Sequence, residues 1–335
     1  MPTFSIIVPS YNSADTVKRC LESILAQDLN DYELIAINDG STDQTGAILE
    51  YMANADRRVR VIHNKTNQGV SNARNKGIDV SQGDYILFID SDDYIGHGYL
   101  RSIYNEIRAD LADIYIWGIT KLINNAGSKV ISPHCFSTFD RVGFLSSFLP
   151  YQQSSGIYGF VANKAVKRDL VEKNGIRFNT NLHLLEDYDF FLSCYKFSER
   201  ITIFPLFDYF YVLPAVSMNS ISRIDSVDYK SLIEVHQKCR DIFKEIGIKK
   251  DEHLHILDKT ISDLVVSAFL EMPKVSHAAI NNLLRELNPW IPVLVTDESR
   301  RTGLIQRLIN NKSSFALSCY MYMRQLYHLI SGHNK

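Results

Sequence analysis

Carboxylates gather directly behind one apolar run of this 335-residue chain, where their spacing could bind a metal ion. Asp90, Asp92 and Asp93 follow Tyr85–Ile89, with Ser91 between the first two. Such closely spaced carboxylates repel each other unless a cation lies among them, and Mg²⁺ commonly binds one or two carboxylates together with phosphate and water. We therefore expect a divalent-metal site that serves a nucleotide diphosphate. The alternative is that one Asp caps the following helix.

Polar residues also follow the other apolar runs of the first 100 residues. In chain order they are Pro9, Tyr11, Asp39, Asp43, Asn67 and Arg74. The carboxyl ends of parallel strands meet at one edge of a sheet, and ligands bind in the crevice beyond that edge. We expect these side chains to face the same ligand as the carboxylates.

The elements that must position these residues follow from the hydrophobic periodicity. Apolar runs predict strands at Phe4–Val8, Glu33–Ile37, Val59–His63, Tyr85–Ile89 and Ile114–Ile119. Helical spacing between them predicts helices near 14–27, 43–55, 70–80 and 98–108. Strands that alternate with helices indicate an α/β fold with a mainly parallel sheet and helices on both faces. From residue 225 onward three apolar stripes predict a helical region.

Composition narrows the class of protein. The chain is 45% hydrophobic and 22% charged, which is typical of a globular protein and not of a disordered one. A formal net charge of −2 argues against a nucleic-acid-binding protein. The five cysteines contain no CxxC pair, and the N-terminus has no signal-peptide pattern. We expect a cytoplasmic protein.

Five motifs in order resemble the family 2 glycosyltransferases of the GT-A fold. They are SIIVPSYNSADTVKRCLESILAQ, NDGSTDQT, NQGVSNARNKGI, GDYILFIDSDDYI, and the stretch from NKAVKRDLVEKNGIRFNTNL to LLEDYDFF. The resemblance covers about residues 3–215 and is strongest over the first 100. It implies a catalytic domain at 1–224, whose half 1–120 binds a nucleotide sugar and whose half 121–224 binds the acceptor.

The resemblance also implies roles for the residues behind the strands. Pro9 and Tyr11 would line the base pocket, Asp39 would accept the N3–H of a uracil-type base, and Arg74 would reach the same nucleotide. Asn67 and Ser91 complete the expected nucleotide-sugar site. Asp90 would lie by the ribose, and Asp92 would ligate the Mn²⁺ or Mg²⁺ that bridges the diphosphate. Asp90 and Asp93 are the other expected metal residues, and Asp93 would also support the loop.

Glu186 and Asp187 match the ED motif of the family, in which the Asp is the general base. An inverting transfer needs a carboxylate that removes the proton of the acceptor hydroxyl. Without the resemblance, both residues could be no more than the solvated start of a helix. Many relatives carry a basic residue shortly after this motif, but here the stretch Phe207–Ser217 contains none, and the next basic residue is Arg223. Either Arg223 contacts the diphosphate or the metal alone stabilises it.

Several other residues have two interpretations each. Asn163 and Lys164 could contact the acceptor, or form a helix cap followed by a solvated lysine. His134 and His183 are expected to be ordinary loop residues.

The end of the chain is basic and amphipathic. Six basic and no acidic residues follow Glu298, interleaved with apolar ones. Residues 299–335 could therefore lie on the anionic inner face of the plasma membrane, pack as a helix pair on the catalytic domain or form a homodimer. A polyprenyl-linked glycan acceptor would suit the membrane alternative.

The whole pattern predicts an inverting, metal-dependent transferase that moves a sugar from a UDP-sugar to a glycan hydroxyl in bacterial surface polysaccharide synthesis. One alternative is a phosphohydrolase with Asp90 as its nucleophile. That alternative leaves Asp39, Asn67 and Arg74 without a role. Another alternative is an inactive relative that serves as a docking partner.

Overall fold

The structure is a computed structural model that divides into two compact units, 1–225 and 226–335. The predicted boundary lay between residues 224 and 225. The described residues are 2–123, 127–213, 228–248, 251–271, 276–290, 305, 307–312, 316–317 and 319–321. Arg223 and most of 299–335 lie outside them, so the roles expected there stay predictions.

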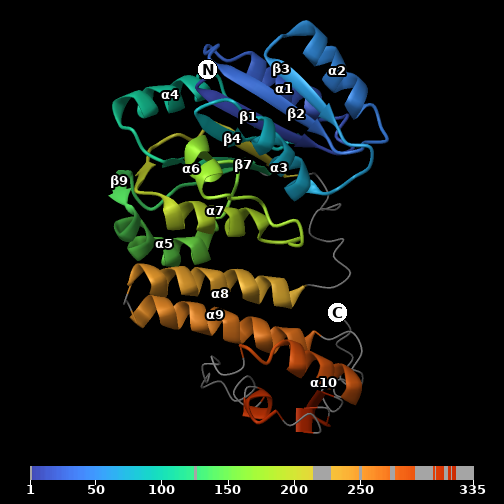
Figure 1. Cartoon of the computed structure of the whole chain (residues 1–335), viewed down its shortest axis with the longest axis vertical. Helices are drawn as coiled ribbons and strands as arrows, with labels where there is room; N and C mark the ends of the chain where they lie inside the picture. The colour runs from blue at the N-terminus through green and yellow to red at the C-terminus, as the bar shows by residue number, and fades with distance from the viewer. Residues whose placement is uncertain are drawn as a thin grey trace. The chain divides into compact units, whose positions relative to one another are not determined.

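The first unit is built on an eight-stranded sheet with the order β3-β2-β1-β4-β10-β6-β11-β9 (Figure 1). The strands are β1 (Phe4–Ser10), β2 (Tyr32–Asn38), β3 (Val59–His63), β4 (Tyr85–Phe88), β6 (Ile114–Ile116), β9 (Ser137–Asp140), β10 (Lys164–Lys167) and β11 (Arg200–Ile203). The first four run parallel, whereas β10 is antiparallel to both its neighbours. Every residue of β1 and β4 is buried, as is typical of strands that are covered on both faces.

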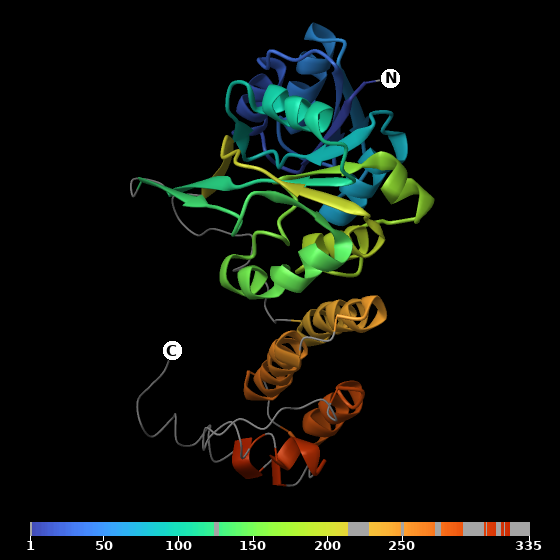
Figure 2. The same cartoon turned by 90° about the vertical axis from the view of Figure 1, so that its left-hand side faces the viewer.

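Helices connect these strands along the chain. Their bounds are α1 (Val17–Leu25), α2 (Thr45–Ala55), α3 (Val70–Val80), α4 (Tyr99–Ala109), α5 (Arg141–Ser155), α6 (Arg168–Lys173) and α7 (Glu186–Phe197). In α1 the buried residues are Val17, Cys20, Leu21 and Ile24, which follow the spacing of one helical face. Figures 1 and 2 show α5 and α7 side by side, and the two helices contact each other. The α/β architecture is the predicted one.

A second, four-stranded sheet has the order β5-β12-β7-β8. Its strands are β5 (Tyr94–Ile95), β12 (Tyr209–Leu213), β7 (Ile119–Ile123) and β8 (Gly127–Ile131). The prediction of one strand at Ile114–Ile119 was therefore wrong, because β6 belongs to the large sheet and β7 to the small one. The chain changes sheets at Trp117–Gly118, and the apolar run is continuous only because both ends of it are buried.

The second unit is helical, as predicted. It contains α8 (Tyr229–Ile246), α9 (Asp251–Leu270) and α10 (His277–Glu286). Its core joins Ile261, Phe269 and Ile280 to residues of the basic tail, namely Ile305, Ile309, Leu317 and Met321. These four tail residues are thus buried within their own unit, and packing of the tail on the catalytic domain, dimerisation and membrane binding all stay predictions. Among the described helices, none has the length and apolar character needed to cross a bilayer.

Candidate active site

The carboxyl ends of β1, β2 and β4 bring the predicted nucleotide-binding residues to one edge of the large sheet. Pro9 is buried near the end of β1, and Tyr11, two positions later, is 48% exposed. The backbone N–H of Asp39 donates to the carbonyl of Ser10, 2.9 Å away, so the two strand ends stay joined beyond the sheet. The exposed ring of Tyr11 and the buried carboxylate of Asp39 thus follow two joined strand ends, where a base could be held.

Asp39 fixes the loop that precedes α3. Its oxygens accept hydrogen bonds from the Asn64 side chain at 2.6 Å and from the backbone N–H groups of Gln68 and Gly69. The Asn67 side chain accepts from the same Gly69 N–H at 2.9 Å. Three donors leave Asp39 room for one more, because a carboxylate has about four acceptor sites. The expected bond to a base is compatible with this geometry, but the carboxylate is only 3% exposed.

Gly40 allows this loop to approach so closely. Its backbone has a positive φ of 69°, and a Cβ atom there would lie 2.4 Å from the carbonyl carbon of Thr66. Any side chain at this position would push the loop away from Asp39.

Arg74 joins the two halves of the predicted site. The guanidinium of this buried residue of α3 lies 2.9 Å from Asp90 and 2.5 Å from Asp187, with Glu186 at 3.5 Å. Although burial opposes the charged form, the three carboxylates raise the pKa of Arg74, so that it stays protonated. Arg74 therefore connects the loop after β4 to the start of α7.

The three carboxylates of the loop after β4 differ in their exposure to solvent. Asp90 is partly exposed and Asp92 is exposed, whereas Ser91 and Asp93 are buried. The oxygens of Asp93 accept hydrogen bonds from the Tyr209 hydroxyl at 2.7 Å and from the backbone N–H of Val212 at 2.9 Å. Asp93 therefore anchors the loop to β12, in keeping with the expected support of the loop, and its expected part in metal binding stays a prediction.

Asp90 and Asp92 are the carboxylates of this loop that could hold a metal ion. Within the described ranges, no group of three or more His, Cys, Asp or Glu side chains could hold a metal ion. Two accessible carboxylates with no third protein ligand match a Mg²⁺ or Mn²⁺ ion that takes its other oxygens from phosphate and water. Arg19, which the sequence did not point to, donates to the carbonyl of Asp92 at 2.5 Å and stabilises the loop.

The start of α7 presents Glu186 and Asp187. Leu185, which precedes them, has a left-handed backbone with φ of 60° and ψ of 17°, which is rare for a leucine. This conformation turns the chain so that both carboxylates enter the first helical turn. Burial raises the pKa of Asp187 to about 7, although Arg74 opposes the shift.

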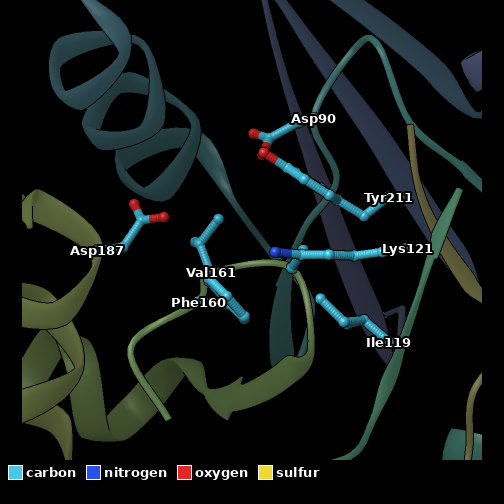
Figure 3. A pocket seen from close by; sticks show the side chains of 8 residues that line it. Asp90, Ile119, Lys121, Phe160, Val161, Asp187 and Tyr211 are labelled. Carbon is cyan, nitrogen blue, oxygen red and sulfur yellow. The ribbon is translucent and has the colours of Figure 1, made fainter. Parts of the chain in front are cut away.

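A cavity of about 150 Å³ lies between Asp90 and Asp187 (Figure 3). Its lining residues are Asp90, Ile119, Lys121, Phe160, Val161, Ala162, Asp187 and Tyr211. The side chains of Asp90 and Asp187 come from separate elements and face the same space (Figure 3). A bound sugar would thus meet apolar and aromatic walls with a carboxylate on two sides.

Comparison with known proteins identifies the family. The model of glycosyl transferase family 2 matches residues 5–162. The glycosyltransferase EpsJ of Bacillus subtilis is 31% identical over 236 residues, which cover 70% of this chain and 67% of EpsJ. The chain belongs to glycosyl transferase family 2.

Two further comparisons concern relatives with a named substrate or ligand. The poly(ribitol-phosphate) beta-glucosyltransferase of Bacillus spizizenii is 34% identical over 213 residues, which are 62% of this glycosyltransferase but only 32% of that longer protein. The crystal structure of S. aureus TarS 1–349 in complex with UDP-GlcNAc matches with a TM-score of 0.67 at 20% identity. The match covers 97% of this chain and 92% of TarS 1–349, which shows a shared fold.

In this glycosyltransferase Lys164 is neither solvated nor in contact with the pocket. It is 1% exposed, and its ammonium group donates to the carbonyls of Ile157 and Phe160 and to the Asn163 side chain. Asn163 in turn donates to the carbonyl of Trp117 at 2.7 Å. Both sequence interpretations of this pair were therefore wrong. Asn163 and Lys164 instead fix the backbone around the pocket by hydrogen bonds to the carbonyls of Trp117, Ile157 and Phe160.

The two histidines are not among the lining residues of the pocket. His134 stacks on Tyr151 with ring centroids 4.1 Å apart and forms a hydrogen bond with the Tyr158 hydroxyl. His183 is exposed in the loop before α7. The expectation of ordinary loop residues agrees with these positions.

Proposed function

We propose that this glycosyltransferase moves a sugar from a UDP-sugar to a hydroxyl of an acceptor glycan, with inversion at the anomeric carbon and a divalent metal. The observation that carries this proposal is the pocket in which Asp90 and Asp187 meet and share Arg74. A donor held at Asp90 would place its sugar within the reach of Asp187. Asp90 would then act on the sugar donor and Asp187 on the acceptor.

Asp187 is the general base in this proposal. Its carboxylate takes the proton of the acceptor hydroxyl while that oxygen attacks the anomeric carbon from the face opposite the leaving diphosphate. Positive charge develops on the sugar ring at this point, as in glycoside hydrolysis, and the carboxylates around the pocket stabilise it. Arg74 holds the direction of Asp187 through a contact of 2.5 Å, and Glu186 contacts the same guanidinium at 3.5 Å.

The donor half uses the residues at the ends of β1, β2 and β4. Pro9 and Tyr11 would hold the base, and Asp39 would read a uracil-type edge with its remaining acceptor site. Asn67 and Ser91 would support the sugar-nucleotide through their loops. Asp90 and Asp92 would hold Mg²⁺ or Mn²⁺, which when bound offsets the negative charge of the leaving diphosphate. The TarS complex with UDP-GlcNAc supports a UDP-linked donor on this fold.

The acceptor in this proposal is a bacterial surface polysaccharide. The named activity of the Bacillus spizizenii relative, glucosylation of poly(ribitol-phosphate), supports an acceptor of this general kind. A lipid-linked form of the acceptor would bring the reaction to the inner face of the plasma membrane.

A donor panel tests the reaction class directly. The full chain is incubated with UDP-, GDP- and dTDP-sugars in Mn²⁺, and nucleotide release is measured with and without acceptor glycans. We expect release of UDP from at least one UDP-sugar and its loss when EDTA removes the metal. Activity with only GDP- or dTDP-sugars would contradict the assignment of the base. Phosphate release from simple phosphate esters would favour the phosphohydrolase.

The rate is expected to rise with pH through about 7. The reason is that Asp187 acts only in its ionised form and its pKa is raised to about 7 by burial. Log(kcat/KM) should therefore increase by about one per pH unit below that value and level off above it. The profile is measured between about pH 5.5 and 9 with one donor and acceptor pair. A profile that stays flat below pH 7 would exclude Asp187 as the titrating base.

A further inference from the structure

The side chain of Lys121 lines the pocket. The other two charged residues of the pocket wall, Asp90 and Asp187, both pair with Arg74. Figure 3 shows the amine of Lys121 directed into the space between the two carboxylates. Within residues 2–123 and 127–213, no ion pair or hydrogen bond is formed by the Lys121 side chain.

Two aromatic rings define where this amine lies. The Nζ atom is 5.6 Å from the ring centre of Phe160 and 5.4 Å from that of Tyr211. Aromatic faces attract a cation and keep the amine at the pocket, but they leave its hydrogen-bond donors free for a ligand. Lys164 fixes one of these rings indirectly, because it binds the backbone carbonyl of Phe160.

A second lysine stands directly beside the first. In the antiparallel pair of β7 and β8, Lys121 is the partner of Lys129, so both side chains lie on the same face of the small sheet. Like charges in directly opposed positions destabilise a sheet. Burial and the charge of Lys129 both lower the pKa of Lys121. Such a pair gains stability from an anion that binds both ammonium groups.

Protection of a sheet edge explains only half of this arrangement. Lys129 is exposed on the outermost strand β8, where a lysine discourages pairing with another chain. Lys121 is half-buried on β7, which has a neighbour on each side. Its position in the pocket therefore needs another reason.

The position of the pair favours the acceptor over the donor. Both lysines belong to the small sheet, whereas the proposed nucleotide site is built on the ends of β1, β2 and β4 in the large sheet. Lys121 also shares its pocket with Asp187, the residue that contacts the acceptor hydroxyl in the proposed function. A group bound by Lys121 would thus be close to the reacting hydroxyl.

We propose that Lys121 and Lys129 bind a phosphate group of the acceptor, next to the hydroxyl that receives the sugar. This inference rests on the proposed function, because the proposed function defines which side of the pocket the acceptor occupies. Lysine binds phosphate as a point charge with several donors. The substrate class is then a phosphate-bearing polyol or glycan.

Ribitol 5-phosphate and ribitol form a matched pair of probes for this site. Each is titrated by calorimetry into the full chain in the presence of saturating UDP and Mg²⁺, so that donor phosphates already occupy their own site. We expect the phosphate to bind, the plain polyol not to bind, and added KCl to weaken binding. Lys121→Met should weaken it about tenfold and Lys129→Met by a smaller factor, while Lys121→Arg retains most of it.

The controls separate the possible sources of the phosphate. Lys173→Met removes an exposed lysine of α6 that pairs with Asp169, and it should bind ribitol 5-phosphate as the wild type does. UDP affinity should be unchanged in Lys121→Met and Lys129→Met. Loss of UDP affinity in Lys121→Met would assign the lysine to the donor diphosphate and overturn the proposal, as would equal binding of ribitol 5-phosphate by the wild type and Lys121→Met.

UDP binding by the wild type tests the proposed function independently of the lysine variants. If the wild type does not bind UDP, the UDP-sugar assignment is contradicted. The ribitol 5-phosphate titrations are then compared without UDP, and the same difference between the wild type and Lys121→Met decides the role of the lysine pair. Circular-dichroism melting curves show whether each variant is folded.

Discussion

Replacement of Asp187 by Asn is expected to lower the rate of sugar transfer by about 10²–10⁴-fold, because the amide cannot accept the proton of the acceptor hydroxyl. UDP affinity should change little, since the proposed nucleotide contacts lie at the ends of β1, β2 and β4. The measurement is kcat for transfer, with UDP binding followed by calorimetry on the same preparation. The small remaining activity should lose its dependence on pH near 7.

Asp169→Asn provides the matched control. Asp169 is exposed on α6, where it pairs only with Lys173 within the described residues, so its amide variant should keep full activity. Normal transfer by Asp187→Asn would remove the general base from the mechanism. That result, combined with loss of activity in Asp90→Ala, would be the pattern expected for an Asp-nucleophile phosphohydrolase.

Replacement of Arg74 by Met is expected to destabilise the fold by about 3–5 kcal/mol. The guanidinium is 3% exposed and compensates Asp90, Glu186 and Asp187, whose charges would then repel each other without a counter-ion. Urea unfolding of the variant and the wild type measures the difference. Activity should fall as well, because Asp187 loses the contact that directs it.

The loss of folding stability in Arg74→Met should increase with pH. Without the guanidinium the folded-state pKa of Asp187 rises further above its unfolded value, so stability is present at low pH and is lost as the pH rises through the folded-state pKa. The difference between Arg74→Met and the wild type should therefore be larger at pH 8 than at pH 5. Arg177→Met, which removes a more exposed partner of Asp79 and Glu172, is the control and should cost about 1 kcal/mol or less. Equal stability of Arg74→Met and the wild type would contradict the assigned role.

Much of the first unit follows from local sequence. The strand Val59–His63 and the helix Val70–Val80 lie where the periodicity placed them, because a short apolar run and an amphipathic helix each have a recognisable local pattern. The edge where polar residues gather followed from the parallel order alone. Asp39, Arg74 and Asp90 could therefore be selected before any contact was known.

Contacts between distant segments could not be predicted in this way. The proposed role of Lys121 depends on its contacts with Phe160, Tyr211 and Lys129. These contacts follow from the register of the small sheet and from the fold of the pocket wall, neither of which has a local sequence pattern. Lys164 looked like a surface residue because lysine is rarely buried, and its burial depends on carbonyls that only the folded loop presents. The function of a side chain in a pocket is thus less visible in sequence than the strand that carries it.

The left-handed backbone of Leu185 lowers the stability of the turn before α7 while it directs the proposed catalytic carboxylates. A left-handed leucine costs about 1–2 kcal/mol that a glycine would not, yet a glycine would loosen the turn that directs Glu186 and Asp187. Leu185→Gly would therefore relieve the strain of this turn and at the same time widen the range of directions open to the two carboxylates.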